Sequence, residues 1–171
     1  MNIFVLSKDP KVCAEYHCDK HVVKMTTELA QMLSNTHHAM NSNIYNLYKP
    51  MQITNRTCKW VRNSEDNYIW TFMLWLHVLL EYRKRYSKKS KPEQLMPYLI
   101  KYPNGKYNDI THLPKSYSYS EVDFDNMPQN MPDEYRNPDP IIAYRDYYNN
   151  VKYTFAKWKS GNIPYWFKPK E

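Results

Sequence analysis

Polar and apolar side chains follow a helical period between residues 17 and 38. The polar positions are three or four residues apart: His17, Lys20, His21, Lys24, Glu28, Gln31, Asn35 and His38. At about 100° per residue they share one face of a helix. The flank and back of that helix are apolar: Val22, Met25, Leu29, Met32 and Leu33. The pattern predicts an amphipathic helix near 19–40, with Val22, Leu29 and Leu33 packed on a central core helix.

Other elements are expected from helix caps and apolar periods. Helices are predicted near 10–16, 64–87, 92–100 and 140–159, the first starting at Asp9–Pro10 and the last closed by Gly161. Residues 64–87 are the most apolar and should form the central helix. Residues 1–6 are predicted as a short strand, and 102–138, rich in Pro, Asn, Ser and Tyr, as an irregular lid or arm. The expected fold is mostly α, with one domain over 1–171.

Composition narrows the class of partner. The net charge of +7 and the pI near 9.1 favour an anionic partner such as DNA or a nucleotide. With only Gly105 and Gly161, the chain has no glycine-rich loop for a nucleoside triphosphate or a dinucleotide. Three cysteines and no apolar leader favour reduced thiols in the cytoplasm. The apolar run 69–80 is too short to span a membrane, and no cofactor is implied.

The polar face between residues 17 and 38 combines amines, imidazoles, carboxamides and one carboxylate. Such a mixture favours a basic pocket, the alternative being a solvated or partly buried polar face. Repulsion between Lys20 and Lys24 favours an uncharged amine that can attack a sugar carbon, and Glu28 would stabilise positive charge there. This suits N-glycosidic bond cleavage. Equally, His17 and His21 with the lysines could bind phosphate or serve as general base and acid.

A metal site is the less favoured interpretation of the same region. Cys13, His17 and His21 are four residues apart, which superficially matches the spacing of metal ligands on a helix. Lys20 and Lys24 would place ammonium groups beside the cation, so we expect no metal.

Three segments resemble the bacterial branch of the pyrimidine-dimer DNA glycosylase family. The first is Lys20-x-x-x-Lys24-x-x-x-Glu28-x-x-Gln31, after the Asn2-Ile3-Phe4 start. The others are Asn55-Arg56-Thr57-Cys58-Lys59-Trp60 and the helix ending Glu81-Tyr82-Arg83-Lys84-Arg85-Tyr86. The likeness covers about the first half of the chain. The whole chain also resembles a group of phage proteins with an H-C-D-K-H-x-x-K core, and a phage origin would place it in the host cytoplasm.

The glycosylase resemblance implies an all-α DNA-binding enzyme with lyase activity, an N-terminal amine as nucleophile and an essential glutamate. Glu28 matches that glutamate, and Met1, Lys20 or Lys24 would supply the amine. The chain departs from the family where Arg56-Thr57 replaces a His-Pro pair and His21 replaces an arginine. The remaining predicted site residues would contact the ligand: His17, His21, Gln31, Asn35, His38, Arg56, Lys59 and Trp60.

Two functions are therefore carried forward. The first is a DNA glycosylase and AP lyase that acts on damaged or modified pyrimidines. The second is a phage protein that sequesters or cleaves a small cyclic nucleotide used as an immune signal. An open basic face would favour DNA, whereas a closed pocket roofed by 102–138 would favour the small ligand. A module that only binds DNA or protein is a third, weaker possibility.

Overall fold

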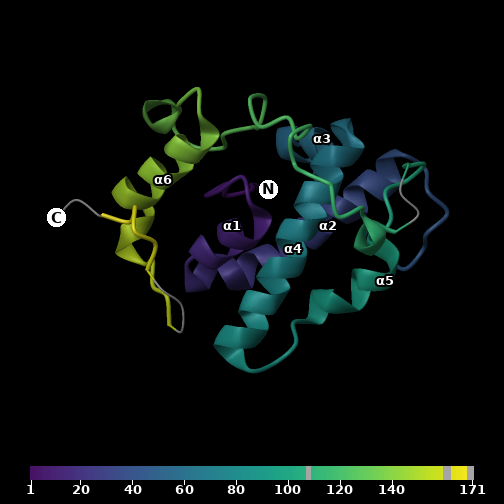
Figure 1. Cartoon of the computed structure of the whole chain (residues 1–171), viewed down its shortest axis with the longest axis horizontal. Helices are drawn as coiled ribbons and strands as arrows, with labels where there is room; N and C mark the ends of the chain where they lie inside the picture. Colours follow the sequence, from purple (N-terminus) through teal and green to yellow (C-terminus); the bar gives the residue numbers. More distant parts are fainter. Residues whose placement is uncertain (107–108, 160–162, 169–171) are drawn as a thin grey trace.

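The central element of the fold is the helix α4, Glu65–Tyr86 (Figure 1). The computed structural model describes residues 1–106, 109–159 and 163–168. Ser64 caps α4 by accepting a hydrogen bond from the Asn67 backbone N–H, 3.1 Å away. The helix ends where Ser87 adopts a left-handed conformation with φ of 53°. The largest fully buried side chains of the core include Trp70 and Trp75 of this helix, so the predicted central helix is confirmed.

Helices α1, Pro10–Tyr16, and α2, Asp19–Ala39, both pack on α4. Asp9 caps α1 as predicted, since its side chain accepts from two backbone N–H groups of the first turn. The apolar side of α2 is fully buried at Val22, Leu29 and Leu33. The Trp75 indole N–H donates to the Thr26 carbonyl over 2.8 Å and ties α4 directly to α2. The helical period and the apolar face are therefore confirmed.

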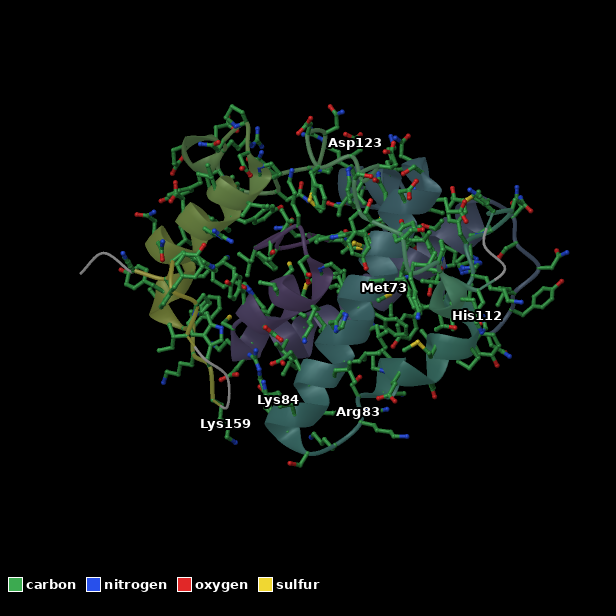
Figure 2. All side chains as sticks on the ribbon, viewed as in Figure 1. Met73, Arg83, Lys84, His112, Asp123 and Lys159 are labelled. Carbon is green, nitrogen blue, oxygen red and sulfur yellow. The ribbon has the colours of Figure 1, made fainter. Side chains whose placement is uncertain are left out.

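Arg85 stabilises the break between α1 and α2. Its guanidinium is fully buried and donates to the carbonyls of Glu15 and His17 at the end of α1. It also pairs with Asp19 in the first turn of α2, at 3.1 Å, and with Glu81, at 2.9 Å. One side chain thus satisfies carbonyls that the end of a helix leaves without partners. In Figure 2 the neighbouring Arg83 and Lys84 lie at the same lower end of α4.

The smaller helices differ from the prediction. Helix α3, Arg56–Asn63, is not among the predicted helices, although Asn55 caps it by accepting from the Thr57 N–H. The expected helix 92–100 is a 3₁₀ turn, Lys91–Leu95, followed by α5, Met96–Leu99. The last helix, α6, Pro140–Asn150, is followed by a 3₁₀ turn at Lys152–Thr154 and does not reach residue 159. The predicted cap at Gly161 lies outside the described residues.

The predicted N-terminal strand is wrong. Residues 1–6 have no regular secondary structure. Ile3 to Leu6 are buried, but among the described residues no strand lies beside them. Side chains instead form hydrogen bonds with backbone N–H and C=O groups of this segment. Cys13 accepts from the Leu6 N–H and donates to the Phe4 carbonyl, and Arg145 donates to the Leu6 carbonyl over 2.8 Å. The segment therefore threads between helices, with α6 on one side and α4 on the other (Figure 1).

The described residues of 102–138 run from α5 past α3 to α6 (Figure 1). They contain two 3₁₀ turns, Ile110–His112 and Asp133–Tyr135, but little other regular structure. Apolar side chains along them join the core, among them Val122, Phe124 and Met131. The irregular conformation matches the prediction, whereas a role as a lid stays a prediction. The mostly α fold is confirmed, and among the described residues no helix is long and apolar enough to cross a membrane.

Candidate functional site

A hollow of about 280 Å³ lies beside the start of the chain. We call it the amino-terminal pocket. Its lining residues are Met1, Asn2, Phe4, Lys24, Glu28, Asn130, Tyr147 and Lys152. They come from four separate parts of the chain: the N-terminal segment, α2, the irregular segment 102–138, and the end of α6 with the turn after it. The cationic groups of Met1, Lys24 and Lys152 outnumber the single carboxylate, so the pocket favours an anionic ligand.

Glu28 and Lys24 lie one turn apart on α2 and form an ion pair across 3.3 Å. The Glu28 side chain is 26% exposed and that of Lys24 is 48% exposed, so solvent and ligand reach both. The second carboxylate oxygen of Glu28 accepts a hydrogen bond from the Asn2 backbone N–H at 3.4 Å. This contact holds the carboxylate next to the first residues of the chain.

The backbone around Met1 is held by side chains from distant segments. The Met1 amino group donates to the Gln52 side-chain oxygen at 3.2 Å. Asn130 donates to the Met1 carbonyl at 3.0 Å and to the Thr57 hydroxyl at 2.7 Å. The amine of Met1 therefore contacts a neutral hydrogen-bond acceptor, the Gln52 side chain, at an exposed position.

His17 and His21 are buried beside the pocket. His17 lies outside α2, at the C-cap of α1, where its Nδ1 bonds to the Cys13 carbonyl over 2.7 Å. His21 hydrogen-bonds to the Tyr148 hydroxyl and stacks on Phe4 with 3.9 Å between ring centres. Burial lowers the pKa of His17 to about 4 and that of His21 to about 2, in the latter case helped by the nearby charges of His17, Lys152 and Lys24. Both imidazoles are therefore neutral at pH 7.

The rear half of the polar face of α2, which we define as Gln31, Asn35 and His38, contacts the backbone of residues 48–51. Gln31 donates to the Lys49 carbonyl over 2.9 Å, and His38 hydrogen-bonds to the Tyr48 carbonyl over 2.8 Å. Asn35 donates to the Met51 carbonyl at 2.7 Å and accepts from the Met51 N–H at 3.2 Å. These contacts hold the loop after α2, and ligand binding by the three residues stays a prediction.

The three site residues predicted on α3 are separated by the structure. Arg56 is exposed and lines two further hollows, of about 380 and 270 Å³, and Lys59 is exposed on the same helix. Trp60 is only 5% exposed, and its indole N–H donates to the Asp123 carbonyl over 2.7 Å. Asp123 is labelled in Figure 2. Arg56 is thus available to a ligand, whereas Trp60 joins the core and a ligand contact by it stays a prediction.

Sequence reasoning missed the pocket residues that come from elsewhere in the chain. The sequence places Lys152 inside a long helix, with no sign that it would meet Lys24. Asn130 lies in a segment without periodicity, so no sequence signal places it at Met1. Lys20 does not line the pocket but lies next to it, with its ammonium 4.8 Å from the centre of the Phe155 ring.

Neither metal binding nor a reactive thiol is indicated by the described residues. Within them, no group of three or more His, Cys, Asp or Glu side chains is arranged to hold a metal ion. Cys13, Cys18 and Cys58 are buried free thiols, and burial raises the pKa of Cys13 to about 12. Comparison of the chain with protein-family models, curated proteins and solved structures finds no match.

Proposed function

We propose that this protein binds DNA over the amino-terminal pocket and cleaves the N-glycosidic bond of a damaged or modified pyrimidine, followed by a lyase step. The observation that carries the proposal is the shared lining of one pocket. An amine, from Met1 or Lys24, and the carboxylate of Glu28 lie together there, among more cationic than anionic groups. The resemblance to pyrimidine-dimer glycosylases points to the same pair of functional groups.

The chemistry needs both groups. The amine attacks C1′ of the nucleoside, and the bond from C1′ to the base breaks as the new C–N bond forms. The base leaves with the bonding electrons and takes up a proton, and opening of the sugar ring gives a Schiff base. Positive charge develops on the sugar in this step, and the Glu28 carboxylate stabilises it. Loss of a C2′ proton and of the 3′-phosphate would then cut the strand.

The hydrogen bonds favour Met1 over Lys24 as the nucleophile. Lys24 forms an ion pair with Glu28 at 3.3 Å, so the carboxylate already engages its side-chain nitrogen. The Met1 amine contacts the neutral oxygen of Gln52. An α-amino group is in general the better nucleophile near neutral pH, since fewer such groups are protonated than lysine side chains.

Three adjoining hollows favour DNA over a small nucleotide. Asn130 lines both the amino-terminal pocket and the next hollow, and Arg56 lines that hollow and a third, which contains Arg136 and one acidic residue, Asp125. A row of shallow, polar hollows suits an extended polyanion better than a compact ligand, which is usually enclosed. Cyclic nucleotides serve as the competing ligands in the test.

Borohydride trapping tests this function. Duplexes that carry ultraviolet-induced pyrimidine dimers, modified pyrimidines or abasic sites are incubated with the protein and borohydride. We expect a covalent adduct on at least one lesion, and peptide mapping to place the DNA on Met1 or on Lys24. The absence of both adduct and strand scission on every lesion would refute the proposal. A rise in melting temperature with a cyclic dinucleotide would then favour the second function.

A further inference from the structure

Three lysines converge beside the amino-terminal pocket from distant parts of the chain. Lys20 and Lys24 lie in the first two turns of α2, and Lys152 lies in the turn after α6. The ammonium groups of Lys20 and Lys152 lie 4.8 and 5.9 Å from the centre of the same Phe155 ring. That of Lys24 lies 5.8 Å from the centre of the neighbouring Phe4 ring. Three positive charges thus surround one aromatic surface.

The surface beneath these lysines is aromatic and neutral. His21 connects its two phenylalanines, since it stacks on Phe4 and meets Phe155 edge to face with ring centres 5.6 Å apart. Tyr147 extends the surface, with the Lys152 ammonium 4.5 Å from the centre of its ring. Each ring attracts a cation weakly through its π face. The rings therefore attract the ammonium groups without neutralising their charge.

Only one of the three ammonium groups is paired with a carboxylate among the described residues. Glu28 pairs with Lys24. Within the described part of the chain, no ion pair joins Lys20 or Lys152 to a carboxylate. Like charges held close together raise the free energy of the unliganded protein, and a bound anion lowers it again. An anion with several acceptor oxygens can contact more than one ammonium group.

We propose that Lys20, Lys24 and Lys152 form a phosphate-binding site that continues the amino-terminal pocket. Its ligand is a phosphate group, either a phosphodiester of a DNA strand or the phosphate of a free nucleotide. Because Lys24 and Lys152 also line the pocket, a phosphate held here would be bonded to the nucleotide within it or next to it. The proposal does not depend on base excision, since it concerns binding alone.

The test compares affinities for two probes. Fluorescence anisotropy measures the affinity of the protein for a labelled DNA strand at salt concentrations between about 50 and 200 mM. Titration calorimetry measures the affinity of the protein for a deoxynucleoside monophosphate. The variants are the Lys20→Gln/Lys152→Gln double substitution, Lys152→Arg, which keeps the charge, and Lys89→Gln. Lys89 is an exposed lysine in the segment after α4 that lines none of the three hollows, and it serves as the matched control. Thermal unfolding shows whether each variant is folded. If the double variant does not fold, the single substitution Lys20→Gln replaces it.

We expect the double variant to bind DNA about tenfold more weakly or worse. The slope of log affinity against log salt should become shallower by about 0.7 for each phosphate that the variant no longer binds. Lys89→Gln should stay within about twofold of the wild type, and Lys152→Arg, which keeps the positive charge, should bind DNA more tightly than the double variant. Parallel weakening of monophosphate binding would assign the site to a terminal phosphate, and weakening of DNA binding alone to a phosphodiester. Equal weakening by Lys89→Gln, unchanged binding by the double variant, or a wild type that binds neither probe would overturn the proposal.

Discussion

The two halves of the polar face of α2 follow the same helical period but have opposite surroundings. The front half, which we define as Lys20, Lys24 and Glu28, is open to solvent and borders the amino-terminal pocket. The rear half, Gln31, Asn35 and His38, contacts the backbone of residues 48–51. A periodic polar face therefore predicts that polar partners exist. It does not predict whether those partners are a ligand or the protein's own backbone.

Two buried histidines at opposite ends of α2 give the largest expected effect: His17 lies just before the helix and His37 lies in its last turn. Burial lowers the pKa of His17 to about 4 and that of His37 to about 4, below the ordinary value of 6.5. The unfolded chain then binds protons that the folded chain does not, so stability is full above pH 6.5 and is lost as the pH falls. Each can contribute a loss of about 2.5 kcal/mol by pH 4.5.

Urea unfolding between pH 7.5 and 4.5 measures this loss. His17→Phe, which removes one titrating group while keeping a ring of similar shape, should flatten the dependence on pH. A free energy of unfolding that stays constant across this range would show that the histidines are not buried as neutral groups.

Truncation of the rear half should destabilise the fold. Asn35 is fully buried and makes two hydrogen bonds to the backbone of Met51. Asn35→Ala leaves these groups without partners and should cost about 2–3 kcal/mol in the free energy of unfolding. Glu28→Gln, about two turns earlier on the same helix, should change that free energy by less than about 0.5 kcal/mol. Equal losses in the free energy of unfolding for the two variants would contradict the proposed difference between the front and rear halves.

The sequence predicts the helices better than the site because helix signals are local. Asp9–Pro10 and Ser64 predict where two helices begin, and the apolar period of α2 identifies Leu29 as a core residue. The buried N-terminal segment is misleading in this respect. Its apolar, extended pattern matches a strand, yet Cys13 and Arg145 supply its hydrogen bonds from outside any sheet.

The residues that complete the candidate site depend on packing between distant segments. Lys24 and Glu28 are recognisable because they share one helix face. Lys152 and Asn130 reach the same pocket only through the placement of α6 and of the segment before it. Arg85 shows the opposite deviation. It lies in a charged helix end that should face solvent, yet its side chain is fully buried between α1 and α2. Neither outcome has a local sequence signal.

The smallest expected effect concerns the exposed lysine of the front half. Lys24→Ala removes one cation from the pocket and should weaken DNA binding with a shallower salt dependence, by about 0.7–0.9 in the logarithmic slope. Stability should change by less than about 0.5 kcal/mol because the side chain is 48% exposed. Anisotropy titrations at several salt concentrations measure the slope. An unchanged slope would mean that Lys24 binds no phosphate.

The most direct test of the central claim is the rate of borohydride trapping under single-turnover conditions for the wild type and Glu28→Gln. The substitution keeps the size and the hydrogen-bonding capacity of the side chain but removes its charge. If the carboxylate stabilises a cationic sugar, the folded variant should still bind DNA and should form the adduct at least about 100-fold more slowly. Equal trapping rates in two folded proteins, or a Glu28→Gln variant that unfolds, would contradict the assignment of the front half as the reactive site.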